Sequence, residues 1–175
     1  EMSASLVGSE MCIRDSHVSL QDPMVLDVYL GRLIRFMAKK ELFENRFMNR
    51  VMTWLGAFPV SRGESDLSAM RTSLKLLADG EALGIFPEGH RYVDGEMHEF
   101  GNGLALIALR SGAPVVPAYI QGSYRLFRRV TVTVGAPVAL DDLGRRCDSR
   151  TLSAATERIQ NAMRALREGD VKKVC

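Results

Sequence analysis

The sequence has few cysteines and no long apolar run, and each absence excludes a class of protein. Its three cysteines, Cys12, Cys147 and Cys175, fall in no metal-ligand spacing and make no even set for disulfide pairing. This favours a reducing compartment and excludes a disulfide scaffold or a zinc site. The longest apolar windows, such as Ala113–Ile120, are far shorter than the roughly 18 to 20 residues that cross a bilayer. We therefore expect no transmembrane helix.

Charge of one sign is also scarce. The chain has 23 Lys and Arg against 21 Asp and Glu, a net charge of +2 over 175 residues. This balance gives no general electric field that would attract nucleic acid, so we expect no nucleic-acid partner. With 46% hydrophobic and 25% charged residues, the composition is typical of a single globular domain with a sizeable core.

The first sixteen residues do not read as part of a domain. Residues 10–16, Glu-Met-Cys-Ile-Arg-Asp-Ser, resemble a translated transposon mosaic end of the kind used to build sequencing libraries. Residues 1–9 have no clear helical or strand period, although a short native segment is the alternative. We interpret residues 1–16 as a sequencing-adapter artefact and leave them out of the predicted fold. The native domain then covers residues 17–175 and lacks its own N-terminus, with any membrane anchor that it carried.

Strand and helix patterns alternate along the rest of the chain. Asp22, followed by proline, is a helix-start signal, and the mixed spacings of Met24–Trp54 predict two helices joined by a break near residues 39–45. The other predicted strands are Ala57–Val60, Ala82–Phe86, Pro114–Ile120 and Val130–Val134, and the other predicted helices are Ser65–Gly80, Leu104–Arg110 and Leu152–Glu168. We therefore expect a single α/β domain with a mixed, mostly parallel sheet covered by helices.

His17 and Asp22 form the first candidate pair of functional residues. Their spacing of five would place them roughly 140° apart on one continuous helix, so they can meet only across a turn. With His17 in the approaching loop and Asp22 at the helix start, the carboxylate could fix the imidazole tautomer and support a general base. The alternative is that Asp22 only caps its helix and His17 is a surface residue.

Two loops that contain arginine follow predicted strands, where ligands of open α/β sheets tend to bind. Arg62 follows Ala57–Val60, and its guanidinium could hold a phosphate group in bidentate fashion. Glu88, Gly89 and Arg91 bring a carboxylate, a flexible backbone amide and a guanidinium together within four positions. The alternatives are a solvated loop arginine in the first case, and in the second a turn in which the glutamate pairs with either arginine.

The remaining segments exclude several chemistries. His90 and His98 lie in one polar loop in which no carboxylate or cysteine completes a ligand set, so we predict no metal site. Pro117 lacks a backbone N–H, which predicts an irregularity or an edge position for its strand, and this strand could also line an acyl pocket. No Gly-x-Ser-x-Gly, P-loop or Gly-x-Gly-x-x-Gly pattern occurs, which disfavours covalent serine catalysis, nucleotide hydrolysis and nicotinamide chemistry.

Four segments, in this order and spacing, resemble the glycerolipid acyltransferase family, and specifically its bacterial 1-acyl-sn-glycerol-3-phosphate acyltransferases. The segment from His17 to Asp22 matches the first family block, His-x4-Asp, and Gly56–Arg62 resembles the second. Phe86–Arg91 resembles the third block and Val115–Pro117 the fourth. The resemblance implies a glycerol-3-phosphate acyltransferase-like fold.

The resemblance also implies an activity. The enzyme would transfer a fatty acyl group from acyl-CoA or acyl carrier protein to the sn-2 hydroxyl of lysophosphatidic acid, giving phosphatidic acid in phospholipid biosynthesis. By the same resemblance, His17 would deprotonate that hydroxyl and Asp22 would orient His17. No acyl-enzyme intermediate and no cofactor would be needed, since acyl-CoA or acyl carrier protein is a co-substrate.

The resemblance assigns binding roles to five more residues. Arg62, Glu88, Gly89 and Arg91 match positions that bind the acceptor, where the arginines would neutralise its phosphate. Pro117 falls in the block associated with the acyl donor.

Some positions depart from the family pattern. They are His90, Tyr92 and the pair Gly101–Asn102, all outside the catalytic pair. These departures leave open a different lysolipid acceptor, such as a lyso-ornithine lipid. Two further functions stay open beside it: an acyl-thioester hydrolase that uses water as the acceptor, and a non-catalytic membrane-binding domain.

The family acts at membranes, and one segment fits that role. Between Arg32 and Arg62 there are seven Lys or Arg and two Glu, the most basic stretch of the chain. The basic and apolar segment Leu30–Trp54 could press one face into the membrane interface while its cations meet anionic head groups. We expect a peripheral or monotopic protein at the cytoplasmic face of the membrane. The alternative is that these helices only cover the sheet.

Overall fold

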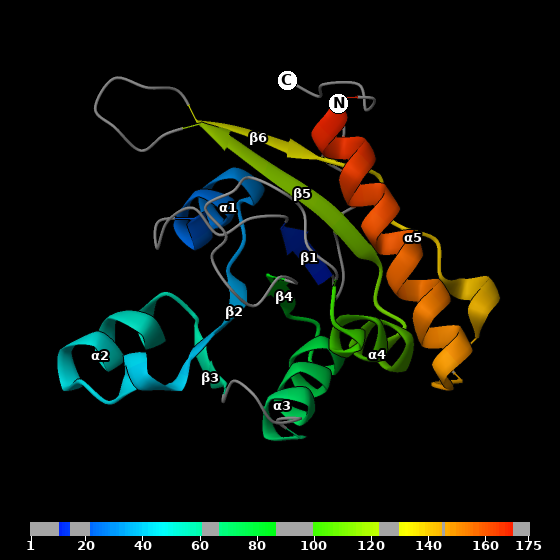
Figure 1. Cartoon of the computed structure of the whole chain (residues 1–175). Coiled ribbons are helices and arrows are strands. Elements are labelled where there is room, and N and C mark those ends of the chain that lie inside the picture. Colours follow the sequence, from blue (N-terminus) through cyan, green and yellow to red (C-terminus); the bar gives the residue numbers. More distant parts are fainter. Residues whose placement is uncertain are drawn as a thin grey trace.

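The computed structural model describes residues 11–14, 22–60, 67–86, 100–122, 130–144 and 146–169. Its six strands form one sheet in the order β3-β2-β4-β1-β5-β6 (Figure 1). The strands are β1 (Met11–Arg14), β2 (Ile34–Lys39), β3 (Phe58–Val60), β4 (Ala82–Ile85), β5 (Val115–Gly122) and β6 (Val130–Val134). The helices are α1 (Asp22–Leu30), α2 (Arg46–Trp54), α3 (Leu67–Ala78), α4 (Asn102–Ser111) and α5 (Ser149–Glu168), with 3-10 turns η1 (Lys40–Phe43) and η2 (Asp141–Leu143).

Strands β1 to β5 are parallel, and only β6 is antiparallel to its neighbour. The predicted mixed, mostly parallel α/β sheet is therefore confirmed. The register places Ile13 of β1 opposite both Ile85 of β4 and Pro117 of β5. Because parallel strands point the same way, the carboxyl ends of β1 to β4 lie along one border of the sheet, which we call the carboxyl edge.

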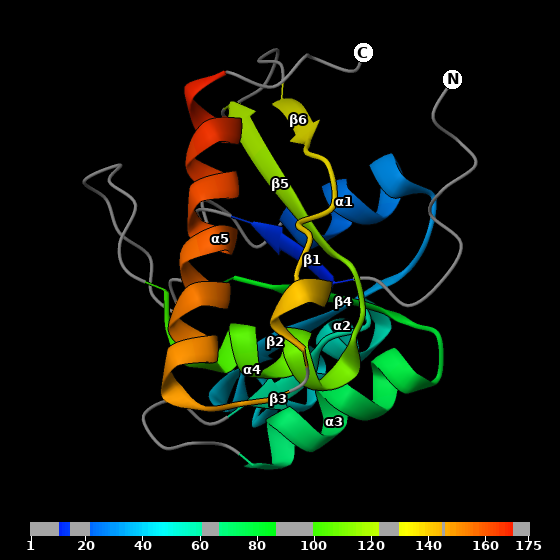
Figure 2. The ribbon, with the colours of Figure 1, turned by 90° about the vertical axis from the view of Figure 1, so that its right-hand side faces the viewer.

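Helices cover both faces of the sheet. Leu83 and Ile85 belong to a buried cluster that also takes side chains from α3, α4 and α5. Ala82 belongs to a second cluster, in which Leu26 of α1 is fully buried, because successive strand residues point to opposite faces. Figure 2 shows α5 and α1 on different sides of the sheet. The fold is thus a three-layer α/β/α domain.

The prediction of two helices over Met24–Trp54 is wrong in its middle part. The first helix ends at Leu30, where Gly31 adopts a φ of +64°, and Ile34–Lys39 forms strand β2 inside the sheet. Burial alternates along this strand, with Ile34 and Phe36 buried, which is a period of two rather than a helical period. The second helix spans Arg46–Trp54 and follows the predicted break near residues 39–45, so this part of the prediction is confirmed.

Met11–Arg14, which the predicted fold does not include, is strand β1 in the interior of the sheet. It pairs in parallel with β4 on one side and with β5 on the other, and Met11 is fully buried. Four residues with little period of their own give a weak strand signal, whereas two neighbouring strands supply the pairing that holds them. The origin of residues 1–16 stays a prediction.

The remaining predicted elements are confirmed with small shifts of their ends. The described part of α3 begins at Leu67, and α4 begins two residues earlier than predicted, at Asn102. Helix α5 begins at Ser149 because Asp148 caps it and accepts the backbone N–H of Thr151 at 2.8 Å. Among the described residues, no helix is both long and apolar enough to cross a bilayer.

Candidate functional site

The predicted site residues fall mostly outside the described part of the chain. Asp22 is the first residue of α1, where its backbone but not its side chain is described, and Pro117 lies in β5. The others lie outside the described residues: His17, Arg62, Glu88, Gly89 and Arg91. What the structure does determine is where each segment that carries them leaves the sheet and what anchors it there.

Three of these segments leave from the carboxyl edge. Residues 15–21 follow Arg14 at the end of β1, residues 61–66 follow Val60 at the end of β3, and residues 87–99 follow β4. The strand order places β4 directly beside β1, with β3 two strands beyond β4. At about 4.8 Å per strand spacing, the ends of β1 and β3 are about 14 Å apart. The three strands that lead to these segments therefore end at one border of the sheet, where open α/β sheets bind ligands.

Both ends of the His17 segment are fixed. On its near side, Arg14 is paired in register with Ala118 of β5. On its far side, α1 begins at Asp22 and is held on the sheet by Leu26, which is fully buried. The predicted helix start at Asp22 is confirmed, since α1 spans Asp22–Leu30.

A hydrogen bond near the C-terminal end of α1 also holds this helix in place. The carboxylate Oδ1 of Asp27 accepts the backbone N–H of Ile34, the first residue of β2, at 2.8 Å. Partial burial raises the pKa of Asp27, while this hydrogen bond acts in the opposite direction. The bond ties α1 to the adjacent strand across the Gly31 turn, so it fixes the helix that follows the His17 segment.

An aromatic stack anchors the segment that carries Glu88, Gly89 and Arg91. Phe86, the residue after β4, stacks on Phe36 of β2 with ring centroids 5.6 Å apart and an interplanar angle of 20°. Gly84 makes room for this arrangement, since a Cβ at that position would overlap the Phe36 ring. The stack holds the start of the third block against the same face of the sheet that α1 covers.

Pro117 does not lie on an edge strand, which corrects the expectation from its missing donor. Strand β5 lies between β1 and β6, and Pro117 is buried. Its carbonyl accepts the N–H of Gly135 at 2.8 Å, just beyond Val134, where β6 ends. Because the N–H and C=O of a strand residue point to the same side, the missing donor faces the end of β6 rather than β1, so the β1–β5 ladder loses no hydrogen bond.

The Pro117 ring lies on the face of the sheet that α5 covers. A Cβ built on Gly135 would lie 2.8 Å from Pro117 Cγ and 3.4 Å from Leu166 Cδ1, an atom of α5. Gly135 is therefore a close-approach position that lets the chain pass over the proline ring. Pro117 thus packs in the interior, in register with Ile13 of the strand that leads to His17.

Sequence reasoning missed three features of this region: β1, the Phe36–Phe86 stack and the close packing at Gly84. The stack follows from the sequence only if Ile34–Lys39 is interpreted as a strand. The part of the chain that the structure describes contains no group of three or more His, Cys, Asp or Glu side chains placed to hold a metal ion.

Comparisons with known proteins agree with this arrangement. A family model described as Acyltransferase matches residues 10–121, a range that includes β1 and all four blocks. The 1-acyl-sn-glycerol-3-phosphate acyltransferase of Bacillus subtilis is 34% identical over 164 residues, which cover 90% of this chain and 81% of that protein. The Streptococcus pneumoniae enzyme of the same name is 30% identical over 139 residues, 76% of this chain and 51% of that protein.

A solved structure is similar as well. The crystal structure of the 1-acyl-sn-glycerophosphate (LPA) acyltransferase PlsC from Thermotoga maritima matches with a TM-score of 0.66 and 25% identity. The match covers 96% of this chain and 69% of that one. The resemblance carried by the four blocks is therefore confirmed, and the chain belongs to the acyltransferase family.

Proposed function

We propose that this protein transfers a fatty acyl group from acyl-CoA or acyl carrier protein to the sn-2 hydroxyl of 1-acyl-sn-glycerol 3-phosphate, giving phosphatidic acid in phospholipid biosynthesis. The observation that carries the proposal is the similarity, over 90% of the chain, to a relative that bears the name of this activity. The fold supports it, because the segments with His17, Arg62 and Glu88 all follow strands that end at the carboxyl edge.

His17 is the general base in this proposal, and Asp22 orients it. His17 takes the proton of the sn-2 hydroxyl as the oxygen attacks the thioester carbonyl. A C–O bond forms, the C–S bond breaks, and the thiolate leaves and receives the proton. Removing the hydroxyl proton makes a neutral alcohol a competent nucleophile, so neither a metal ion nor a bound cofactor is required.

The acceptor lies along the carboxyl edge in this proposal. Arg62 and Arg91 bind its phosphate, Gly89 lets the backbone approach it closely, and Glu88 is the fourth acceptor-binding residue. Strand β4, which leads to the third block, lies beside β1, which leads to the His17 segment, and β3, which leads into the loop with Arg62, lies farther along the edge. In lysophosphatidic acid the phosphate is on the carbon next to the one that bears the free hydroxyl, so a phosphate site close to the His17 segment suits this acceptor. Pro117 contributes by packing in β5 next to β1, on the donor side.

The proposed substrates also indicate where in the cell the enzyme acts. Lysophosphatidic acid is a membrane lipid, whereas acyl-CoA and acyl carrier protein are water-soluble. The enzyme therefore works at the cytoplasmic face of a membrane, as a peripheral or monotopic protein.

The direct test measures free-thiol release from a long-chain acyl-CoA in detergent micelles, with and without lysophosphatidic acid. We expect release that depends on the lysolipid and falls by about two to four orders of magnitude in His17→Ala, the range typical of a lost general base. His98→Ala is the matched control, since His98 lies outside the four blocks, and it keeps its activity.

The opposing outcomes each contradict a part of the proposal. Release without any lysolipid would identify a thioester hydrolase. Release with lyso-ornithine lipid but not with lysophosphatidic acid would assign a different acceptor. A folded chain that binds both substrates and releases no thiol would indicate a non-catalytic domain.

A further inference from the structure

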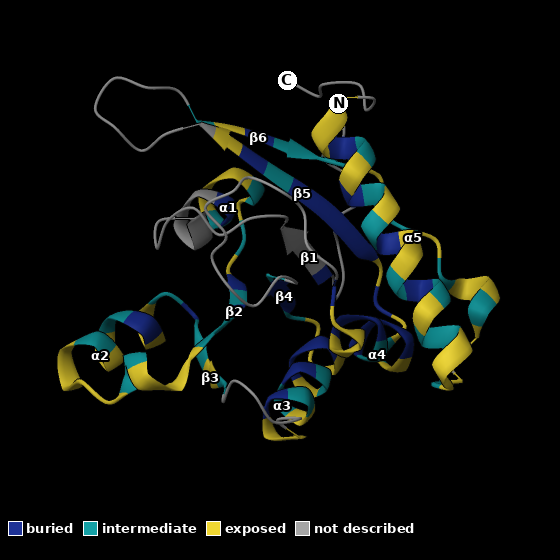
Figure 3. Cartoon of the chain, viewed as in Figure 1, coloured by how far each residue is buried: buried dark blue, intermediate teal, exposed yellow. Residues whose placement is uncertain are grey.

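Helix α2 stands apart from the rest of the fold. It lies beside the edge strand β3, its main packing partner is the short turn η1, and Met52 is its only buried residue. Figure 3 shows a helix that is mostly exposed or half-buried, at the side of the molecule opposite α5. Most of its surface is therefore available for contact with something outside this chain.

The exposed side of α2 carries two large aromatic side chains. Phe47 is 73% exposed and Trp54 is 76% exposed, the highest values among the aromatic residues that the structure describes. Seven residues make almost two helical turns, so these side chains lie about 20° apart around the helix axis. Met52, which is buried, projects from the opposite side of the helix, roughly 150° away. We call the side with Phe47 and Trp54 the aromatic face.

Positive charge borders the aromatic face. Arg46 and Arg50 lie within about a quarter turn of it and are both exposed, and α2 contains no acidic residue. Neither arginine forms an ion pair with any residue that the structure describes. Lys39, by contrast, is paired with Glu41 at 2.9 Å. The aromatic face therefore presents apolar rings next to two uncompensated cations.

We propose that the aromatic face of α2 docks on an anionic phospholipid bilayer, with Phe47 and Trp54 in the interface and Arg46 and Arg50 on lipid phosphates. Exposed aromatic rings beside arginines are the composition of a helix that lies in the membrane interface. A protein partner is less well matched, since a stable interface needs about 800 Å² on each side and one short convex helix offers little area.

The position of α2 suggests what this docking does for the enzyme, and this part of the inference rests on the proposed function. Strand β2 ends at the carboxyl edge, and α2 begins seven residues after Lys39, close to that edge. Docking through the aromatic face holds the border of the sheet that carries the His17 and Glu88 segments near the bilayer. The lysolipid acceptor then has a short path from the bilayer to the site.

The helix tolerates the substitutions that test the proposal. Asn45 caps α2, because its side chain accepts the backbone N–H groups of Phe47 and Met48 at 2.9 and 3.3 Å. A change in the Phe47 side chain leaves both bonds in place, since they involve backbone donors. Phe47 and Trp54 contribute little to the core, so their loss leaves the fold intact.

Trp54 is the only tryptophan of the chain, so its fluorescence reports on this face alone. The experiment adds vesicles of phosphatidylglycerol and phosphatidylcholine in equal parts to the full chain, with no acyl donor or lysolipid present. We expect a blue shift of the emission and strong quenching when the lipids carry bromine on their acyl chains. Vesicles of phosphatidylcholine alone give a much smaller shift, because the arginines then lack anionic partners.

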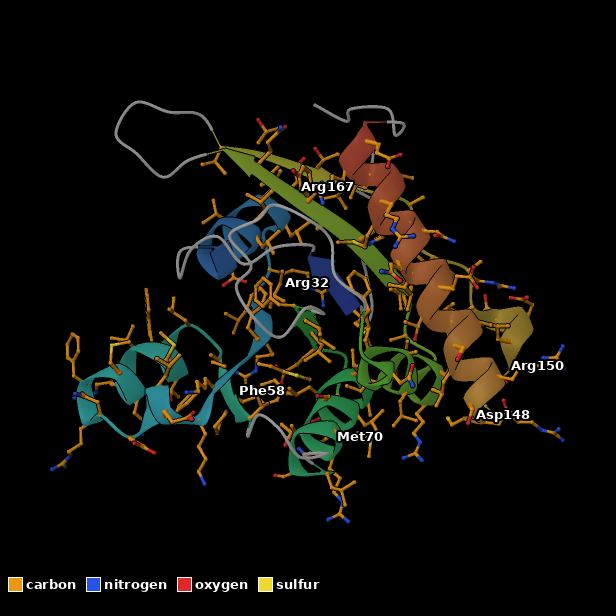
Figure 4. All side chains as sticks on the ribbon, in the orientation of Figure 1. Arg32, Phe58, Met70, Asp148, Arg150 and Arg167 are labelled. Carbon is orange, nitrogen blue, oxygen red and sulfur yellow. The ribbon has the colours of Figure 1, made fainter. Side chains whose placement is uncertain are left out.

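Variants separate charge from apolar contact. The double variant Arg46→Glu, Arg50→Glu weakens vesicle binding at least about thirtyfold, as expected for two basic residues at an anionic surface. The matched control reverses two exposed arginines, Arg150 and Arg164, of α5, the helix on the opposite side of the molecule (Figure 4), and leaves binding unchanged. Phe47→Ser weakens binding in sedimentation assays, whereas Val28→Ser, at an exposed position of α1, does not.

Several results would overturn the proposal. One is an emission that does not shift with anionic vesicles, and another is equal vesicle binding by the two charge-reversed variants. A third is a blue shift that grows with protein concentration in the absence of lipid, which would assign this face to a second copy of the chain. A shift with an acidic acyl carrier protein but not with vesicles would assign it to a protein partner. Because no substrate is present, these results are independent of thiol release, which can succeed or fail on its own.

Discussion

Helices α2 and α5 have similar sequences in one respect and opposite roles in the fold. Both are amphipathic and basic, yet α5 buries Ala155, Ile159, Met163 and Leu166 along one side, and α2 buries only Met52. The spacing of the four α5 residues brings them onto one face of the helix, which packs on β5 and α4 (Figure 3). Apolar residues at helical spacing therefore mark a core face in α5 and an outward face in α2.

The arginines of the two helices differ in the same way. Arg158 of α5 forms a bidentate pair with Asp142, at 2.5 and 2.7 Å, and donates to the carbonyl of Ala139 at 3.2 Å. These contacts attach the helix to η2. Arg46 and Arg50 of α2 make no such contact with described residues. Arg158 of α5 thus serves internal structure, whereas Arg46 and Arg50 of α2 are presented to the surroundings.

The largest expected difference between the two helices is in the loss of stability when one apolar residue on each is truncated. Ile159→Ala should lower the free energy of unfolding by about 3 kcal/mol, because it opens a cavity beside fully buried neighbours. Trp54→Ala should change it by less than about 0.5 kcal/mol, as is usual for exposed positions. Urea denaturation followed by circular dichroism measures both. Equal losses would mean that α2 is part of the core.

A smaller and more local effect is expected for Met52→Ala. Met52 is the one buried residue that holds α2, so its truncation should cost about 2 kcal/mol and release that helix from η1. Hydrogen exchange should accelerate for amides of α2 while those of β4 and β5 stay protected. Met163→Ala in α5 is the comparison, with faster exchange throughout the sheet. A uniform change in both variants would refute the local attachment of α2.

The smallest expected effect concerns the ion pair between Arg158 and Asp142. The hydrogen bonds from Arg158 lower the pKa of Asp142, so the folded state holds the ionised carboxylate more strongly than the unfolded chain does. The resulting stability is present above the ordinary carboxyl pKa and is lost as the pH falls through the lowered pKa of Asp142. In an NMR titration, Arg158→Ala should return the pKa of Asp142 toward its ordinary value. Arg50→Ala, the matched control on α2, should leave that pKa unchanged.

Elements with strong local signals are predicted well from the sequence. The helix start at Asp22, strands β4 and β5, and helices α3 and α5 all follow from capping residues, short apolar runs or clear helical spacing. The prediction for Met24–Trp54 fails because Leu33, Ile34, Phe36 and Met37 fit both a helical and a strand period. Pairing with β3 and β4 decides in favour of the strand.

The candidate site shows the same contrast between features that local sequence predicts and features that depend on distant segments. The order and spacing of four short blocks indicated the family, which the comparisons then confirmed. They gave no account of how the blocks are held, because Phe36 and Phe86 are 50 positions apart and meet only through the β2–β4 pairing. Of the two expectations for Pro117, a local irregularity or an edge position, the edge position was wrong: β5 is an interior strand, and the missing N–H faces the end of β6 rather than β1.

The sequence by itself determined the family and most of the helices, since motifs and caps depend on residues close together in the chain, and it predicted the residues of the candidate site. Only the tertiary structure decided that Met11–Arg14 and Ile34–Lys39 are sheet strands, because strand pairing is a contact between distant segments. It also decided which amphipathic helix is covered and which is exposed. Periodicity defines an apolar face, but the neighbouring elements determine whether that face is buried.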